Sequence, residues 1–148
     1  MADQASSSIT IDAPAAEVLD VISDLHRYPE WTGQIKRAEV LDTYPDGRPR
    51  RATFSMSASG FSDDYTLDYT YRDDGVSWTL VAPTKLQKSQ EGSYRLVGAG
   101  TGTEVTYLLV LESKIPMIGP MKRKANKMII ESALSELKKR VEALHRLT

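Results

Sequence analysis

The sequence predicts an α+β domain in which a seven-stranded antiparallel sheet wraps around one long C-terminal helix, with two short helices after the first strand. One observation is a stretch from residue 121 to 147 without proline or glycine, in which apolar residues recur at spacings of three and four: Ile130, Leu134, Leu137, Val141 and Leu144. Another is a series of period-two segments, separated by turn residues, that fills most of the chain before it. At about 1.5 Å per residue, the helix would measure about 40 Å and cross the whole sheet, which leaves room for a hollow between the two.

The length and composition bound the other possibilities. A chain of 148 residues, 41% hydrophobic and 26% charged, is long enough for one sizeable core, so we expect a single domain over 1–148 with residues 1–6 flexible. A net charge of -1 gives no basic face for nucleic acid, and the absence of cysteine excludes disulfides and thiolate metal sites. No apolar run is long enough for stable membrane insertion, and the N-terminus lacks the features of a signal peptide, so we expect a cytoplasmic protein.

The first elements follow from short patterns near the N-terminus. Residues 7–11 alternate as a strand, and the Asp12-Ala-Pro14 segment then predicts the start of a short helix with Val18, Ile22 and Leu25 on its apolar side. Pro29 disfavours helical geometry at the residue before it, so this helix should end near His26, before a second short helical turn.

Six further strands are predicted from residue 35 onward. Turn signals such as Pro45-Asp46-Gly47 and the glycine-rich segment 98–102 separate them. The connections are short enough for antiparallel hairpins, which makes the sheet a meander. The predicted strands span residues 35–43, 50–58, 62–72, 76–82, 86–97 and 103–113.

Alternation along these strands predicts an aromatic inner face. In the third of them, Tyr65, Leu67, Tyr69 and Tyr71 share one face, opposite Asp64 and three other polar residues. The same rule groups further inward residues: Val76, Trp78 and Leu80; Gly92, Tyr94 and Leu96; Val105, Tyr107, Leu109 and Leu111. Seven tyrosines against two phenylalanines do not suit a dry core, because each buried hydroxyl needs a partner. Either a wet or ligand-filled interior supplies it, or the hydroxyls reach water at the rim.

Other polar residues give weaker indications. Asn126 projects onto the same side of the long helix as Ile130, where it could meet a polar ligand group or bond to a strand end. Asp63 and Asp64 are adjacent in a strand and point to opposite faces, so both are interpreted as solvated rather than as an acid/base pair. The two histidines lack metal-ligand spacing, and we expect no metal site.

A set of short motifs spread over the chain points to one known family. They are Ile9-Thr-Ile-Asp-Ala-Pro14, Val18, Ile22, Asp24, Tyr28-Pro-Glu-Trp31, Gly92-Ser-Tyr94, Thr103-Glu-Val105-Thr-Tyr107, Ile115-Pro116 and the final helix. Together they resemble the SRPBCC (START-like) superfamily, in particular its bacterial polyketide cyclase/dehydrase-like and coenzyme Q-binding branches. The resemblance covers nearly the whole chain and implies a helix-grip fold with an apolar ligand pocket between sheet and helix. It leaves the activity open, because one fold hosts many functions.

The function expected from these features is the binding of a hydrophobic or amphipathic small molecule (lipid, quinone or polyketide-like) by a carrier, sensor or chaperone without a cofactor. The alternatives are a polyketide aromatase/cyclase or dehydratase, for which no catalytic constellation stands out, and an interaction protein whose pocket is filled by its own side chains.

Besides the ligand we expect a monomer or weak homodimer and allow for transient membrane contact through Lys122–Lys124. The candidate pocket residues are Trp31, Phe54, Met56, Tyr65, Tyr69, Trp78, Tyr94, Tyr107 and Asn126, with the parity of strand 50–58 left open.

Overall fold

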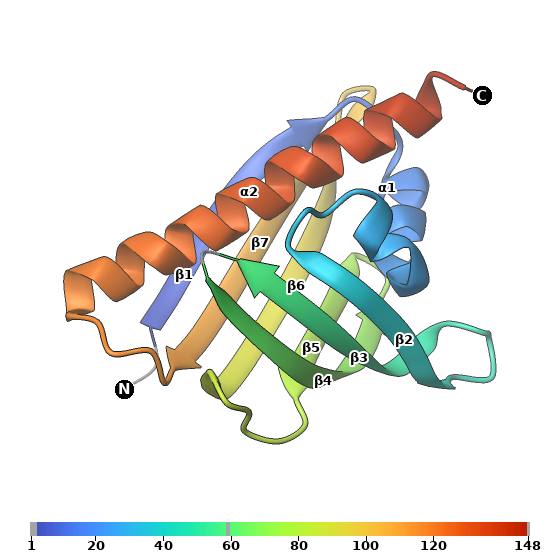
Figure 1. Ribbon diagram of the computed structural model, residues 1–148. Coiled ribbons are helices and arrows are strands. Elements are labelled where there is room, and N and C mark those ends of the chain that lie inside the picture. The colour runs from blue at the N-terminus through green and yellow to red at the C-terminus, as the bar shows by residue number, and fades with distance from the viewer. Residues whose placement is uncertain (1–2, 59, 148) are drawn as a thin grey trace.

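The computed structural model describes residues 3–58 and 60–147 (Figure 1). It contains seven strands, two α-helices and one 3-10 helix within these residues. In chain order they are β1 (Asp3–Ile11), α1 (Ala15–Ser23), the 3-10 helix η1 (Leu25–Glu30), β2 (Ile35–Thr43), β3 (Pro49–Ala58), β4 (Phe61–Arg72), β5 (Gly75–Leu80), β6 (Gln87–Ala99), β7 (Gly102–Ser113) and α2 (Gly119–His145).

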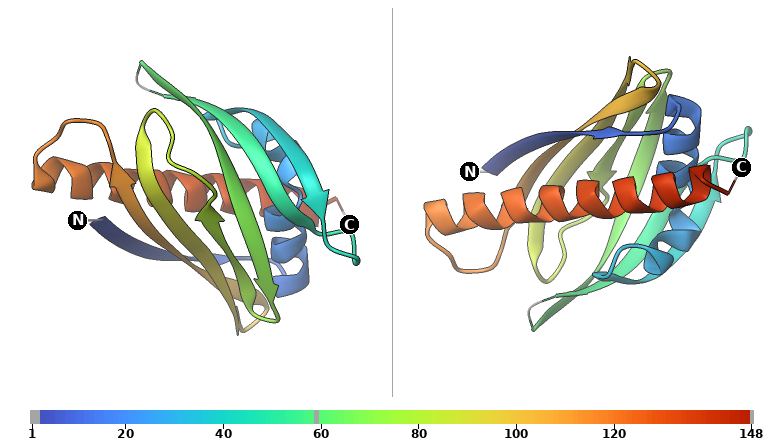
Figure 2. Two further views of the ribbon diagram at one scale, coloured as in Figure 1. Left: turned by 90° about the horizontal axis from the view of Figure 1, so that it is seen from below. Right: turned by 90° about the horizontal axis from the view of Figure 1, so that it is seen from above.

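All seven strands form one antiparallel sheet in the order β1-β7-β6-β5-β4-β3-β2. Consecutive strands from β2 to β7 are neighbours, and only β1 joins out of sequence, at the far edge beside β7. The sheet is twisted and curved, and α2 crosses its concave side from end to end (Figures 1 and 2). The predicted α+β helix-grip architecture is therefore confirmed, with a meander and two short helices after β1.

The N-terminal strand is longer than the sequence predicted. It begins at Asp3 rather than Ser7, and its backbone pairs with β7 from Asp3 opposite Leu111 to Ile11 opposite Thr103. The predicted start of this strand is therefore wrong, whereas the flexibility expected for residues 1–6 stays a prediction, and residues 1–2 lie outside the described part. The run Ser6-Ser-Ser8 lacks the apolar alternation by which strands are predicted. The strand forms nevertheless, because pairing at a sheet edge uses backbone groups and requires few apolar side chains.

The turn after α1 also differs from the prediction. The second short helix was predicted to follow the segment around Pro29. In the structure this segment itself forms that helix, η1, from Leu25 to Glu30. The Tyr28 hydroxyl donates a 2.5 Å hydrogen bond to the carbonyl of Ile22 and so fixes η1 against the end of α1. This contact places Trp31, the next residue after η1, at the end of the concave face.

Helix α2 is held to the sheet by one buried stripe. Four apolar residues of the predicted pattern are buried, namely Ile130, Leu134, Leu137 and Val141, whereas Leu144 is 38% exposed. The carboxylate of Glu142 accepts hydrogen bonds from Lys138 Nζ at 2.7 Å and from the backbone N–H of Asp12 at 2.9 Å. These bonds hold the pKa of Glu142 below its ordinary value and tie α2 to the β1–α1 turn.

Within the described residues, no helix combines the length and hydropathy that crossing a bilayer requires.

Candidate ligand-binding cavity

A cavity of about 240 Å³ lies between the concave face of the sheet and α2. Its walls come from η1 and the segment after it, from strands β2 to β7, from the β5–β6 and β7–α2 connections and from the middle of α2. The lining residues are Tyr28, Trp31, Thr32, Gln34, Ile35, Phe54, Met56, Asp63, Tyr65, Leu67, Tyr69, Trp78, Leu86, Gln87, Gln90, Tyr94, Tyr107, Leu109, Leu111, Ser113, Ile115, Ile129, Ser132, Ala133 and Glu136.

Strand alternation determines which side chains reach this cavity. In β4, Tyr65, Leu67 and Tyr69 line it, as the period-two pattern predicted. The parity of β3, which the sequence left open, is settled by the structure, since Phe54 and Met56 face the cavity. Eight of the nine candidate residues line the cavity: Trp31, Phe54, Met56, Tyr65, Tyr69, Trp78, Tyr94 and Tyr107.

The ninth candidate, Asn126, does not line the cavity. It is 4% exposed and lies in the N-terminal half of α2, one turn before Ile130, so its predicted burial on the apolar side of the helix is correct. The cavity instead meets α2 further along, at Ile129, Ser132, Ala133 and Glu136. The helical projection placed Asn126 correctly around the helix axis, but it contained no information on which turn of α2 covers the cavity.

The inner wall is a cluster of aromatic rings centred on Trp78. Its ring centroid lies 5.4 Å from that of Tyr94 and 5.6 Å from that of Tyr107, and these two tyrosine centroids are 4.7 Å apart. Glycine at position 92, opposite Trp78 on β6, makes this packing possible, because a Cβ there would lie 2.3 Å from Cε2 and Cζ2 of the indole. Gly92 therefore leaves the space over β6 that the indole of Trp78 occupies.

The tyrosine hydroxyls of the cavity are chemically available. Within the described part of the chain, no hydrogen-bond partner is found for the hydroxyls of Tyr65, Tyr69, Tyr94 and Tyr107, in contrast to that of Tyr28. Burial raises the pKa of all four phenols above the ordinary value. These side chains therefore stay protonated around neutral pH and present both a donor and an acceptor to whatever occupies the cavity.

Alkaline pH is expected to destabilise the protein through these tyrosines. A phenol whose pKa is higher in the folded than in the unfolded state keeps its stabilising effect below the unfolded pKa of about 10 and loses it as the pH rises further. We therefore expect the free energy of unfolding to be insensitive to this group below about pH 10 and to fall above it. Phenolate absorbance and thermal unfolding should change together, whereas independent titration of all tyrosines in the intact fold near their ordinary pKa would contradict the burial.

The opening of the cavity lies between the start of β2 and α2. Of the lining residues, Gln34, Ile129 and Ser132 are the most exposed, and they come from these two segments. Two contacts bridge the segments at one side, since the backbone N–H of Gly33 donates to Glu136 at 3.2 Å and Arg140 bonds to Glu30 at 2.9 Å. Trp31, which was predicted to guard one end of the pocket, lines the cavity and lies beside Tyr28 with ring centroids 5.0 Å apart.

Asp63 is a cavity-lining residue that the sequence interpretation missed. It was taken as solvated, but it is 6% exposed and lines the cavity. Its Oδ2 accepts hydrogen bonds from Thr84 Oγ1 at 2.6 Å and from Gln87 Nε2 at 3.2 Å. The signal was present in the sequence, because the alternation that turns Tyr65 and Tyr69 inward also turns Asp63 inward.

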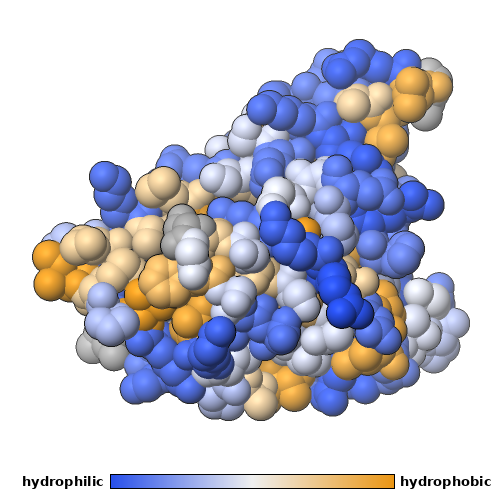
Figure 3. Space-filling model, viewed as in Figure 1, coloured by the Kyte–Doolittle hydropathy of each residue, from blue (hydrophilic) through white to orange (hydrophobic). Residues whose placement is uncertain are grey.

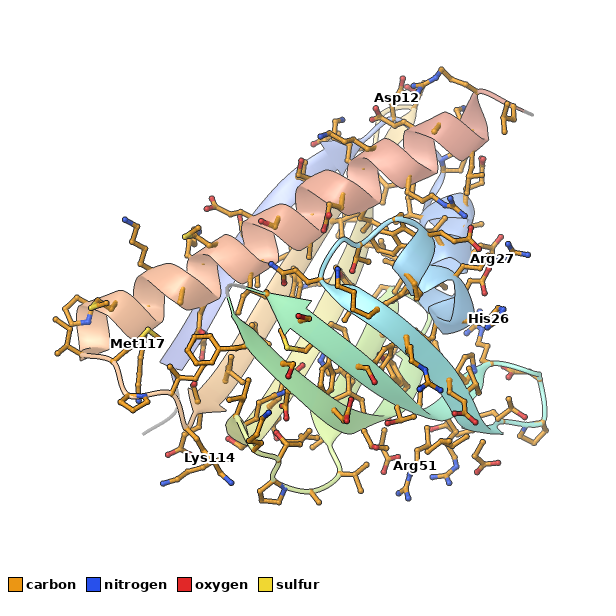
Figure 4. All side chains as sticks on the ribbon, viewed as in Figure 1. Asp12, His26, Arg27, Arg51, Lys114 and Met117 are labelled. Atoms are coloured by element: carbon orange, nitrogen blue, oxygen red, sulfur yellow. The ribbon has the colours of Figure 1, made fainter. Side chains whose placement is uncertain are left out.

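Basic side chains are absent from the described cavity walls. Arg51, on β3, is directed away from α2 and bonds to Asp68 through Nε at 2.7 Å and Nη2 at 3.0 Å (Figure 4). His26 is exposed beside α1 (Figure 4), and His145 of α2 pairs with Glu17 at 2.9 Å. No group of three or more His, Cys, Asp or Glu residues in the described ranges is placed to hold a metal ion.

The family model described as polyketide cyclase / dehydrase and lipid transport matches residues 3–142. Among curated proteins, none matches the sequence. Among solved structures, a START superfamily protein from Mycobacterium smegmatis is 27% identical, with a TM-score of 0.88 over 95% of this chain and 98% of that one.

Two more distant structures share the fold alone. The Zhui aromatase/cyclase from Streptomyces sp. R1128 is 12% identical, with a TM-score of 0.81 over 96% of this chain and 94% of its own. A STAR-related lipid transfer protein from Xanthomonas axonopodis is 20% identical, with a TM-score of 0.70 over 93% and 85%. With the helix-grip fold and a match over nearly all its residues, the chain belongs to the polyketide cyclase/dehydrase and lipid transport family of the START-like (SRPBCC) superfamily.

Proposed function

We propose that the protein binds a hydrophobic or amphipathic small molecule in the cavity beneath α2, as a carrier, sensor or chaperone. The observation that carries this proposal is the set of four tyrosine hydroxyls that line an otherwise largely apolar cavity without protein partners among the described residues. The four hydroxyls keep accessible surface in the cavity, because the buried side-chain atoms without a partner in the described residues are Ser23 Oγ and Tyr71 Oη and none of these four. A guest or water can therefore hydrogen-bond to them within a largely apolar space.

The size of the cavity limits the ligand. Pockets for drug-sized ligands usually measure about 300–1,000 Å³, so a cavity of about 240 Å³ suits a compact molecule or one segment of a longer one. Apolar contact would supply most of the affinity, at about 25 cal/mol per Å² of buried area, and the hydroxyls would orient the guest.

A polyketide aromatase/cyclase or dehydratase is the second candidate. It is supported by the family and by the fold shared with an aromatase/cyclase. Such chemistry needs a proton donor and acceptor within reach of a folded poly-β-keto chain, and the cavity offers tyrosines and two carboxylates but no cation from the described residues. Binding alone requires fewer groups than catalysis, and we therefore favour the carrier.

Mass spectrometry of organic extracts from protein purified out of its native cell tests the two functions. A carrier should release a stoichiometric apolar compound, and the Tyr94→Phe variant should release less of it while unfolding at nearly the same temperature. Turnover of an added poly-β-ketone by the wild type would instead establish the enzyme. Extracts without any enriched compound, together with no turnover, would contradict both functions.

The end of the molecule where α2 begins suits transient contact with a membrane. Three large apolar side chains, Ile118, Met121 and Met128, are exposed there, and Lys122–Lys124 lies among them. Figure 3 shows apolar surface gathered at this end, and Figure 4 places Lys114 and Met117 there. Apolar side chains ringed by basic ones favour the interface of an anionic bilayer.

We expect the protein to sediment with vesicles that contain phosphatidylglycerol, less so at high salt, and not with pure phosphatidylcholine. Replacing Ile118 and Met121 by aspartate should abolish this binding. Equal sedimentation of the variant and the wild type would exclude this end as the contact.

A further inference from the structure

A chain of hydrogen bonds runs along the floor of the cavity from Trp78 to Asp63. The Trp78 Nε1–H donates to Gln90 Oε1 at 2.9 Å, and Gln90 Nε2 donates to Gln87 Oε1 at 2.6 Å. Gln87 Nε2 then donates to Asp63 Oδ2 at 3.2 Å. All four side chains line the cavity, and they come from the three adjacent strands β4, β5 and β6.

The donor chemistry of Trp78 fixes the donor-to-acceptor direction of every hydrogen bond in this row. An indole N–H is only a donor, so Gln90 must present its oxygen to Trp78 and its amide N–H to Gln87. By the same logic Gln87 must present its amide N–H to Asp63. In every one of these hydrogen bonds the donor lies on the Trp78 side, and the last acceptor is the carboxylate of Asp63.

One oxygen of this acceptor is left for a guest. Both protein donors, Thr84 Oγ1 and Gln87 Nε2, bond to Oδ2, and within residues 3–58 and 60–147 no hydrogen bond to Oδ1 is found. The residue is 6% exposed, and it belongs to the cavity lining. Oδ1 is not one of the buried side-chain atoms that lack a partner, which in the described residues are Ser23 Oγ and Tyr71 Oη, so it is accessible from the cavity. A ligand that donates to this oxygen replaces water with a charge-assisted hydrogen bond.

We propose that Asp63 Oδ1 binds the hydroxyl of a neutral ligand whose apolar body lies against the aromatic wall. The proposal rests on the proposed binding function and names its ligand class. The cavity also disfavours anionic ligands. Asp63 and Glu136 both line it, and no described lysine, arginine or histidine does so. A carboxylate or phosphate head would meet like charge without a counter-charge.

Three naphthalene derivatives of similar size test this assignment by titration calorimetry at neutral pH. 2-Naphthol donates a hydrogen bond, 2-methoxynaphthalene only accepts one, and 2-naphthoate is an anion. We expect the wild type to bind 2-naphthol about tenfold more tightly than either of the others, the equivalent of one charge-assisted hydrogen bond.

The Asp63→Asn variant separates a binding role from a structural one. Its amide oxygen can keep the bonds from Thr84 and Gln87, which places an N–H donor where Oδ1 was. We therefore expect the preference for 2-naphthol over 2-methoxynaphthalene to vanish or reverse, an outcome that simple loosening of the fold would not produce. The matched control is Asp64→Asn, on the exposed opposite face of β4, which should keep the wild-type preference.

The outcomes distinguish this inference from the function on which it rests. If 2-methoxynaphthalene and 2-naphthol bind the wild type equally well, or 2-naphthoate binds as well as 2-naphthol, the cavity binds apolar guests but Asp63 does not select them. An unchanged preference in Asp63→Asn has the same meaning. If none of the three probes binds the wild type, the proposed binding function itself fails.

Discussion

Replacing Ala133 with phenylalanine is expected to reduce the binding of 2-naphthol by at least about tenfold, while the protein remains folded. Ala133 lines the cavity from the middle of α2, where it faces the aromatic wall of the sheet. A phenyl ring at this position would occupy much of a cavity of about 240 Å³, and Ala133 is not one of the buried residues that hold α2 to the sheet. The measurement is calorimetric titration of the variant, paired with its thermal unfolding.

The matched control is Ala143→Phe, which makes the same substitution on the same helix. Ala143 is exposed and does not line the cavity, so this variant should bind the probe as the wild type does. Equal affinity of Ala133→Phe and Ala143→Phe would show that guests bind elsewhere.

The second large effect concerns stability. Truncating Leu137 to alanine should lower the free energy of unfolding by about 2–5 kcal/mol, because Leu137 is 0% exposed at the centre of the α2 stripe and its removal leaves a void. Chemical denaturation measures this loss. The size of the effect follows from the position of α2, which covers the concave face and closes the core.

Leu144→Ala provides the comparison for that experiment. Leu144 continues the same apolar spacing but is 38% exposed, so its truncation should cost well under half as much. If both variants lost the same stability, the packing of α2 against the sheet would differ from that described.

Most of the fold was predictable from the sequence because it depends on periodicity. The alternation in residues 62–72 placed Tyr65 and Tyr69 inside, and the spacing of Ile130 and Leu137 defined the buried side of α2. The start of β1 at Asp3 was missed, since an edge strand needs backbone partners more than apolar side chains.

The polar part of the candidate site was harder to predict. Asp63 was assigned to solvent together with Asp64, because the two point to opposite faces and form no acid/base pair, although the parity of Asp63 matched that of Tyr65. The donors that make its burial tolerable, Thr84 and Gln87, lie more than twenty residues away in sequence and approach only when β4 and the β5–β6 connection fold together. No local pattern could show that contact, nor which turn of α2 covers the cavity.

The central claim is that a hollow persists beneath α2 and admits an apolar guest. A crystal of the protein held under xenon pressure tests it most directly, because xenon occupies apolar cavities without needing a specific bond. We expect a xenon peak among Tyr69, Trp78 and Tyr107, with the rings in the positions described. A crystal structure in which native side chains fill this space and no xenon binds there would contradict the account.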